Sequence, residues 1–73
     1  MALTVTDLKE IASRSGGMVL DASKYTATDL KEIASRASGN GSRIFLNKVG
    51  KLTATELKEI ASRGKGAVVF DLT

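Results

Sequence analysis

The sequence TATDLKEIASR at residues 26–36 returns almost unchanged at two other places in the chain. TVTDLKEIASR occupies residues 4–14, and TATELKEIASR occupies residues 53–63. The motif leucines Leu8, Leu30 and Leu57 are therefore separated by 22 and then by 27 residues. Repetition at such periods is typical of stacked supersecondary units. The second interval is longer because it contains the Gly-, Ser- and Asn-rich stretch ASGNGSR, which predicts a longer surface loop.

Each copy of the repeat carries the signals of a helix start. A threonine stands three residues before an acid, which is the spacing of a capping box, and the apolar residue before that threonine completes a hydrophobic staple with the motif leucine. The caps are Thr4, Thr26 and Thr53. We expect the helices to end at the glycines that follow, which are Gly16, Gly39 and Gly64.

A short apolar run that ends in Asp or Asn follows each expected helix. These runs are MVLD at residues 18–21, IFLN at 44–47 and VVFD at 68–71, and each predicts a short strand. Strands joined through a helix should be parallel, with right-handed crossovers. The expected fold is therefore α/β: one domain of three tandem helix–strand repeats (residues 3–24, 25–51 and 52–73), with a three-stranded parallel sheet and helices on one face, forming a small solenoid-like layer.

The passage MVLDASKYTATDLKEIA, which joins one expected strand to the next helix, resembles a leucine-rich repeat of the helical, ribonuclease-inhibitor type. That family reads L-x-L-x-x-N-x-L followed by a helix. Its positions fall here on Met18, Leu20, Ser23 and Tyr25, then on Leu30 and Ile33, with Ile44 and Leu46 matching in the next copy. The family's asparagine position holds Ser23 and then Val49, so its side-chain ladder is altered. The resemblance implies a small αβ solenoid layer and a tendency toward protein binding.

The phrase LTVTDLKEIA is also similar to the helical segment of SAP-type DNA-binding modules. Its threefold recurrence in alternation with strands argues against that interpretation.

The composition excludes several kinds of chemistry. The 73 residues contain no Cys and no His, so the chain lacks thiolate nucleophiles, the usual general base and the commonest metal ligands. We therefore expect no enzyme, no cofactor and no metal. No secretory signal or membrane span is expected either, which would make a natural chain cytoplasmic. The restricted alphabet, with no Pro or Trp, and the faithful repetition indicate an engineered, idealised or recently duplicated sequence.

Polar residues end each expected strand, at Asp21, Asn47 and Asp71. Parallel sheets often place sites at this edge, so a hard-cation or catalytic site is conceivable there. Hydrogen bonds to the turns that leave the strands are the simpler role. The glycine-rich turns follow helices and open strands, which is the reverse of a phosphate-binding loop.

A row of apolar side chains should point away from the helices, because residues alternate between the two faces of a strand. The row consists of Val19, Phe45 and Val69. No other segment is present to cover it, and an uncovered apolar layer usually marks an interface. The chain also begins with a helix and ends with a strand, so its two ends are complementary. We expect the chain to bind itself, as a sheet-to-sheet dimer or as a head-to-tail assembly.

Rows of basic residues on the helices give an alternative function, weak binding of nucleic acid or another polyanion. The rows consist of Lys9, Lys31 and Lys58, and of Arg14, Arg36 and Arg63. The net charge is only +3, and no aromatic stacking platform accompanies them. Each arginine also stands four residues after a glutamate, which predicts an ion pair within the helix. Nucleic acid is therefore not the expected partner.

Overall fold

The computed structural model describes residues 3–72, in which three α-helices alternate with three strands. The helices are α1 (Val5–Ser13), α2 (Ala27–Ala37) and α3 (Ala54–Gly64). The strands are β1 (Met18–Asp21), β2 (Ile44–Asn47) and β3 (Val68–Phe70), and a 3₁₀ helix (Ala22–Lys24) follows β1. The predicted α/β class is confirmed. The third strand stops one residue before the predicted end at Asp71.

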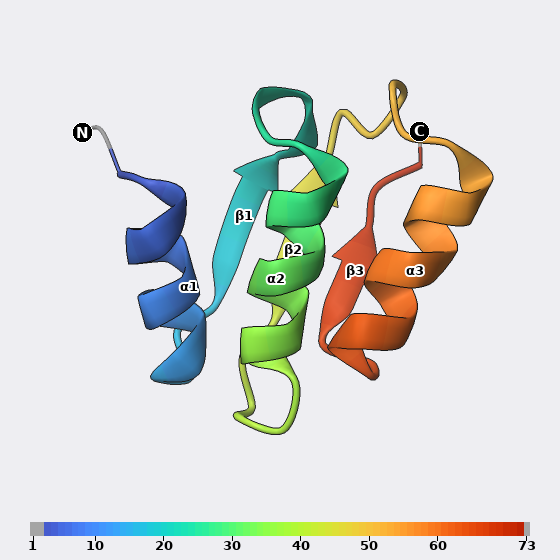
Figure 1. Cartoon of the computed structure of the whole chain (residues 1–73). Helices are drawn as coiled ribbons and strands as arrows, with labels where there is room; N and C mark the ends of the chain where they lie inside the picture. Colours follow the sequence, from blue (N-terminus) through green and yellow to red (C-terminus); the bar gives the residue numbers. More distant parts are fainter. Residues whose placement is uncertain (1–2, 73) are drawn as a thin grey trace.

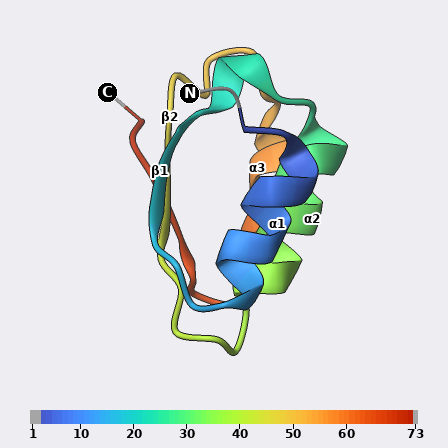
Figure 2. The ribbon, with the colours of Figure 1, turned by 90° about the vertical axis from the view of Figure 1, so that its left-hand side faces the viewer.

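The strands form one parallel sheet in the order β1-β2-β3. Val19 is opposite Phe45, which in turn is opposite Val69. All three helices lie on one face of this sheet, and the opposite face carries no helix (Figure 2). With the helices in front and the strands pointing upward, the chain moves from left to right (Figure 1), so the crossovers are right-handed as predicted.

The core lies between the helices and the sheet. Leu20, Ile44 and Leu46 point into it from the strands, while Val19 and Phe45 between them are exposed. This alternation is the two-residue period expected of strands that are buried on one face. The helices contribute the motif leucines and isoleucines, of which Leu30, Ile33 and Ile60 are fully buried.

The helix starts agree with the sequence signals. Thr4, Thr26 and Thr53 are the N-caps, and each hydroxyl accepts a hydrogen bond from the backbone amide three residues later. At α1 and α3 the carboxylate of Asp7 or Glu56 also accepts a hydrogen bond from the backbone amide of the threonine, so two capping boxes are complete. At α2 only the threonine bond forms.

The prediction that the helices end at the glycines is confirmed for α3, which ends at Gly64, but α1 ends at Ser13, before Gly16. Ser15 after α1 and Lys65 after α3 take the left-handed conformation, with φ of 69° and 50°, and Gly66 after Lys65 also has a positive φ, of 91°. Gly64 is the last residue of α3 and is buried. A Cβ at Gly64 would lie 2.6 Å from Val68 Cγ2, so this glycine is required for close packing of α3 on β3. Gly39 after α2 has the expected positive φ.

The predicted ion pairs within the helices do not form at contact distance in residues 3–72, although the charge of Arg63 helps to lower the pKa of Glu59. Glu32 and Glu59 instead pair with lysines of the preceding helix: Lys9 Nζ lies 3.1 Å from Glu32 Oε1, and Lys31 Nζ lies 2.8 Å from Glu59 Oε1. In residues 3–72 the remaining salt bridge joins Lys48 to Asp21 at 3.9 Å, and none joins a helix glutamate to its arginine. The neighbouring helix brings a lysine ammonium closer than the arginine four residues away.

Candidate interaction surfaces

The open face of the sheet carries the predicted apolar row. Val19, Phe45 and Val69 are 71%, 44% and 37% exposed, and they are direct neighbours across the three strands. They line a hollow of about 170 Å³ together with Asn47, Phe70 and Asp71. The sequence therefore located this surface correctly, and the structure adds a shallow depression at its carboxyl edge.

The polar residues at the strand ends mainly support local structure. Asp21 caps the 3₁₀ helix, and its carboxylate accepts hydrogen bonds from the hydroxyl and the backbone amide of Ser23. These bonds, aided by Lys48, hold the pKa of Asp21 below its ordinary value of 3.8. The Asn47 side-chain oxygen is buried without a hydrogen-bond partner within the described chain. Among residues 3–72 no group of acids is arranged to hold a metal ion.

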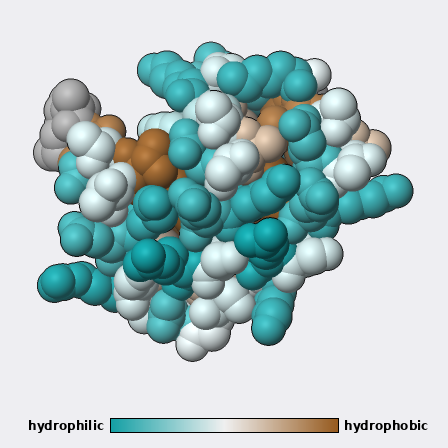
Figure 3. All heavy atoms as spheres, in the orientation of Figure 1, coloured by the Kyte–Doolittle hydropathy of each residue, from teal (hydrophilic) through white to brown (hydrophobic). Residues whose placement is uncertain are grey.

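The two basic rows differ in their availability. Lys9 and Lys31 are half-buried in the ion pairs that join the helices, whereas Lys58 is exposed. The arginine row is exposed throughout, and its members are Arg14, Arg36 and Arg63. The helix side of the molecule is largely hydrophilic (Figure 3). The structure thus leaves three arginines and one lysine of these rows accessible to a polyanion.

A second hollow, of about 200 Å³, lies among the glycine-rich turns at the amino ends of the strands. Arg43 and Lys65 line it together with Gly39, Gly41 and Gly66. The carboxyl ends of α2 and α3 lie at these turns, and a helix carries partial negative charge at its carboxyl end. The two cations therefore complement the helix ends, which makes the hollow a poor anion site.

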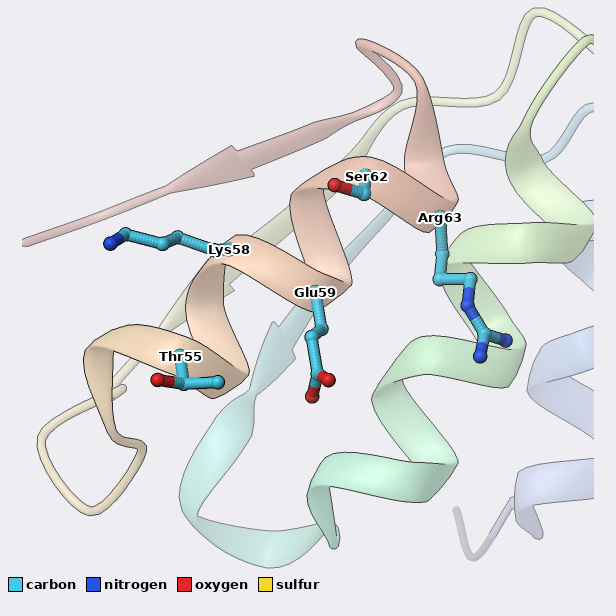
Figure 4. Close-up of a pocket in the computed structure, with 5 residues that line it drawn as sticks. All are labelled: Thr55, Lys58, Glu59, Ser62 and Arg63. Carbon is cyan, nitrogen blue, oxygen red and sulfur yellow. The ribbon is translucent and has the colours of Figure 1, made fainter.

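A third hollow, of about 230 Å³, lies on the outward side of α3 and is lined by Thr55, Lys58, Glu59, Ser62 and Arg63. Glu59 and Arg63 point toward α2, while Lys58 points away from it (Figure 4). Lys31 donates a hydrogen bond to Glu59 and holds the pKa of its carboxyl below the ordinary value of 4.5. All five lining side chains are polar or charged, so the hollow lacks the apolar and aromatic side chains that predominate in small-molecule sites.

Sequence reasoning missed the exposed residues at the two ends of the layer. Ala12 and Ala34 are buried, but the equivalent Ala61 of α3 is exposed. Ile33 and Ile60 are buried, but the equivalent Ile11 of α1 is half-buried. The alignment of the three copies contained a signal for this difference in exposure. The first and last helices carry the same residues as the central helix but have a helix on one side only.

Comparison with protein-family models, with curated proteins and with solved structures gives no match. Within the part of the chain that the structure describes, no helix is long and apolar enough to cross a membrane.

Proposed function

We propose that this chain is a non-catalytic repeat module whose copies bind one another through the open face of the sheet. The observation that carries the proposal is the cross-strand row of Val19, Phe45 and Val69, which is apolar, continuous and exposed. Burying such a row against a second copy removes apolar surface from water, which stabilises the complex by about 25 cal/mol per Å² of buried surface. A 73-residue domain has a small core, so association also adds to its stability.

Phe45 is the residue to change, because it lies at the centre of the row and belongs to the middle strand. Phe45→Glu would place an unpaired carboxylate in the contact and should weaken association about tenfold or more. The phenyl ring is already 44% exposed, so the helices should remain folded. Sedimentation velocity across micromolar concentrations, with circular dichroism as the folding check, measures both effects.

Ser35→Glu is the matched control, because Ser35 is exposed on α2, on the opposite side of the molecule. It should leave the association constant unchanged. A wild-type chain that stays monomeric at all concentrations would refute the proposal. So would a Phe45→Glu variant that associates as well as the wild type.

Polyanion binding is the alternative, and the exposed row of Arg14, Arg36 and Arg63 supports it. It predicts affinity for single- or double-stranded DNA at low salt that falls steeply as salt rises. Two of the lysines are held in ion pairs, so we expect this affinity to be weak. Fluorescence anisotropy with a labelled oligonucleotide at about 20 mM and about 200 mM salt distinguishes the two functions, because only polyanion binding should fall steeply between these concentrations.

A further inference from the structure

The three helices are joined by an ion pair that repeats in one direction. Lys9 of α1 pairs with Glu32 of α2, and Lys31 of α2 pairs with Glu59 of α3. In each pair the lysine belongs to the earlier helix and the glutamate to the later one. Lys9, Lys31 and Lys58 are equivalent in the repeat, as are Glu10, Glu32 and Glu59.

One lysine and one glutamate of this series are left over. Within residues 3–72 no helix follows that of Lys58, none precedes that of Glu10, and neither side chain forms a salt bridge. Both side chains are exposed. Lys58 points to the side of α3 away from α2, where the next helix of the series would lie (Figure 4). The two ends of the layer therefore carry the two opposite charges that pair with each other between neighbouring helices.

The apolar residues at the ends show the same complementarity. Ala12 and Ala34 are 0% and 1% exposed, and a later helix follows each of them. Ala61 is exposed, and among the described residues no helix lies beside it on the side away from α2. At the other end Ile11 is half-buried, although Ile33, which has a helix before it, is completely buried. Each end thus exposes the apolar residue that its missing neighbour would cover.

The edges of the sheet are complementary as well. Met18 N donates to Arg43 O at 2.9 Å, and one strand further Ile44 N donates to Ala67 O at 2.8 Å. If β1 of a second copy paired with β3 in the same register, Val68 N would donate a hydrogen bond to the Gly17 carbonyl of that copy. Because ladder bonds alternate between the two sides of a strand, Val68 N and the Gly17 carbonyl point to the outer edges of β3 and β1.

We propose that a second copy of this chain docks end to end, with its α1 and β1 continuing the layer after α3 and β3. Lys58 of one copy pairs with Glu10 of the next, Ala61 is covered by the incoming α1, and the strands pair in the existing register. Val19 of the second copy then lies beside Val69, which lengthens the apolar row. This inference rests on the proposed self-association and adds a contact distinct from the open face.

Ala61→Glu tests the contact without disturbing the monomer, because Ala61 is exposed in the single chain. Ser62→Glu is the matched control: its equivalent in the central helix, Ser35, stays exposed between two neighbours, so position 62 should stay exposed in the assembly. We expect Ala61→Glu to weaken the end contact about tenfold or more, because it buries an unpaired charge. The control should keep the wild-type mass in sedimentation velocity.

A charge exchange tests the register itself. Lys58→Glu and Glu10→Lys should each weaken the end contact a few-fold, roughly threefold to tenfold, because each places like charges opposite one another. An equimolar mixture of the two variants, and the double variant, should recover the wild-type mass. Failure of both to recover it would overturn the proposed register.

The outcomes separate this inference from the proposed function. A monomeric wild type refutes both. A wild type that associates, dissociates on Phe45→Glu and is unaffected by Ala61→Glu keeps the open-face contact and overturns the end contact. Loss of mass on Ala61→Glu together with recovery by charge exchange supports the end contact.

Discussion

Two neighbouring residues at the end of α3 differ in backbone conformation and in burial. Gly64 is helical and buried, and its missing Cβ leaves the space that Val68 fills. Lys65 is exposed and has φ 50° and ψ 49°, the left-handed conformation in which any Cβ is crowded. Helix-end geometry alone would favour glycine at position 65, where the backbone is left-handed. The glycine lies at position 64 instead, because packing on β3 requires it there.

Lys65→Gly should raise the free energy of unfolding by about 0.5–1 kcal/mol, because glycine adopts the left-handed conformation without a steric penalty. Lys65→Ala keeps a Cβ and should give no such gain. Urea unfolding of the three chains measures the difference. Equal stabilisation by alanine and glycine would contradict the backbone explanation.

Gly64→Ala should destabilise the protein by about 1 kcal/mol. The added methyl would lie 2.6 Å from Val68 Cγ2 and 3.6 Å from Ala34 Cβ, and this overpacking outweighs the gain in helix propensity. Combining Gly64→Ala with Val68→Ala should cost less than the sum of the two single changes, because the second removes the clash. Additive effects in a double-mutant cycle would argue against this contact.

At the level of single elements, the helix starts follow from local residues. The α2 cap depends on one bond, from the amide of Asp29 to the hydroxyl of Thr26 at 3.1 Å, whereas α1 and α3 have reciprocal boxes. Aspartate is one methylene shorter than the glutamate of α3, yet Asp7 does reach back at α1. The difference between Asp7 and Asp29 has no explanation in their sequence context.

Thr26→Ala should cost about 1 kcal/mol of stability, because an amide in the first turn of α2 loses its acceptor. Thr28→Ala removes the same atoms from an exposed position inside the helix and should be neutral or slightly stabilising. Chemical denaturation of both variants measures the contrast. Similar losses at the two positions would show that the cap contributes nothing specific.

The ion pair between α2 and α3 makes stability depend on pH. Lys31 holds the pKa of Glu59 below 4.5, so the folded state prefers the ionised carboxyl more than the unfolded state does. The stabilisation is fully present above that ordinary value and is lost as pH falls through the lower folded value.

Lys31→Gln should raise the pKa of Glu59 toward 4.5 and make unfolding less sensitive to acid below that pH. Carboxyl chemical shifts followed by NMR during an acid titration report the pKa directly. Lys65→Gln, in the loop after α3, serves as the control and should leave Glu59 unchanged. A Glu59 titration that is identical in wild type and Lys31→Gln would contradict the pairing.

Local signals account for what could be predicted among these elements. Caps and strands are encoded within a few residues, so Thr26 and the run IFLN were sufficient to place α2 and β2. The partners of Glu32 and Glu59 were not predictable in the same way, because the competition between an arginine four residues away and a lysine on the next helix depends on how the helices pack. The role of Gly64 was missed for the same reason.

At the scale of the whole molecule, counting elements predicted the open face correctly. Three helices follow right-handed crossovers onto one side, so nothing in the described chain covers Val19, Phe45 and Val69. The exposed ends were harder to foresee, because Ala61 and Ala34 have identical neighbours in sequence and differ only in whether a helix follows.

Association should make thermal stability depend on concentration. Because an assembled copy buries surface that a single copy exposes, the midpoint of thermal unfolding should rise with protein concentration. Phe45→Glu should flatten this dependence. Differential scanning fluorimetry measures this midpoint. The protein concentration should be varied over roughly a hundredfold range, which is wide enough to reveal a mass-action effect. A wild-type midpoint that does not change with concentration would contradict association of the folded state.

The two layers of the molecule have different natural spacings. Neighbouring strands lie about 4.8 Å apart, whereas packed helices lie about 8–10 Å apart, and the three helices accordingly spread wider than the three strands (Figure 1). Copies added end to end would therefore bend into an arc with the sheet on its inner side. Val19, Phe45 and Val69 would line that concave wall, where a second layer fits less well as the arc lengthens. In such an assembly, growth at the ends would thus compete with pairing of the faces and would limit the number of copies.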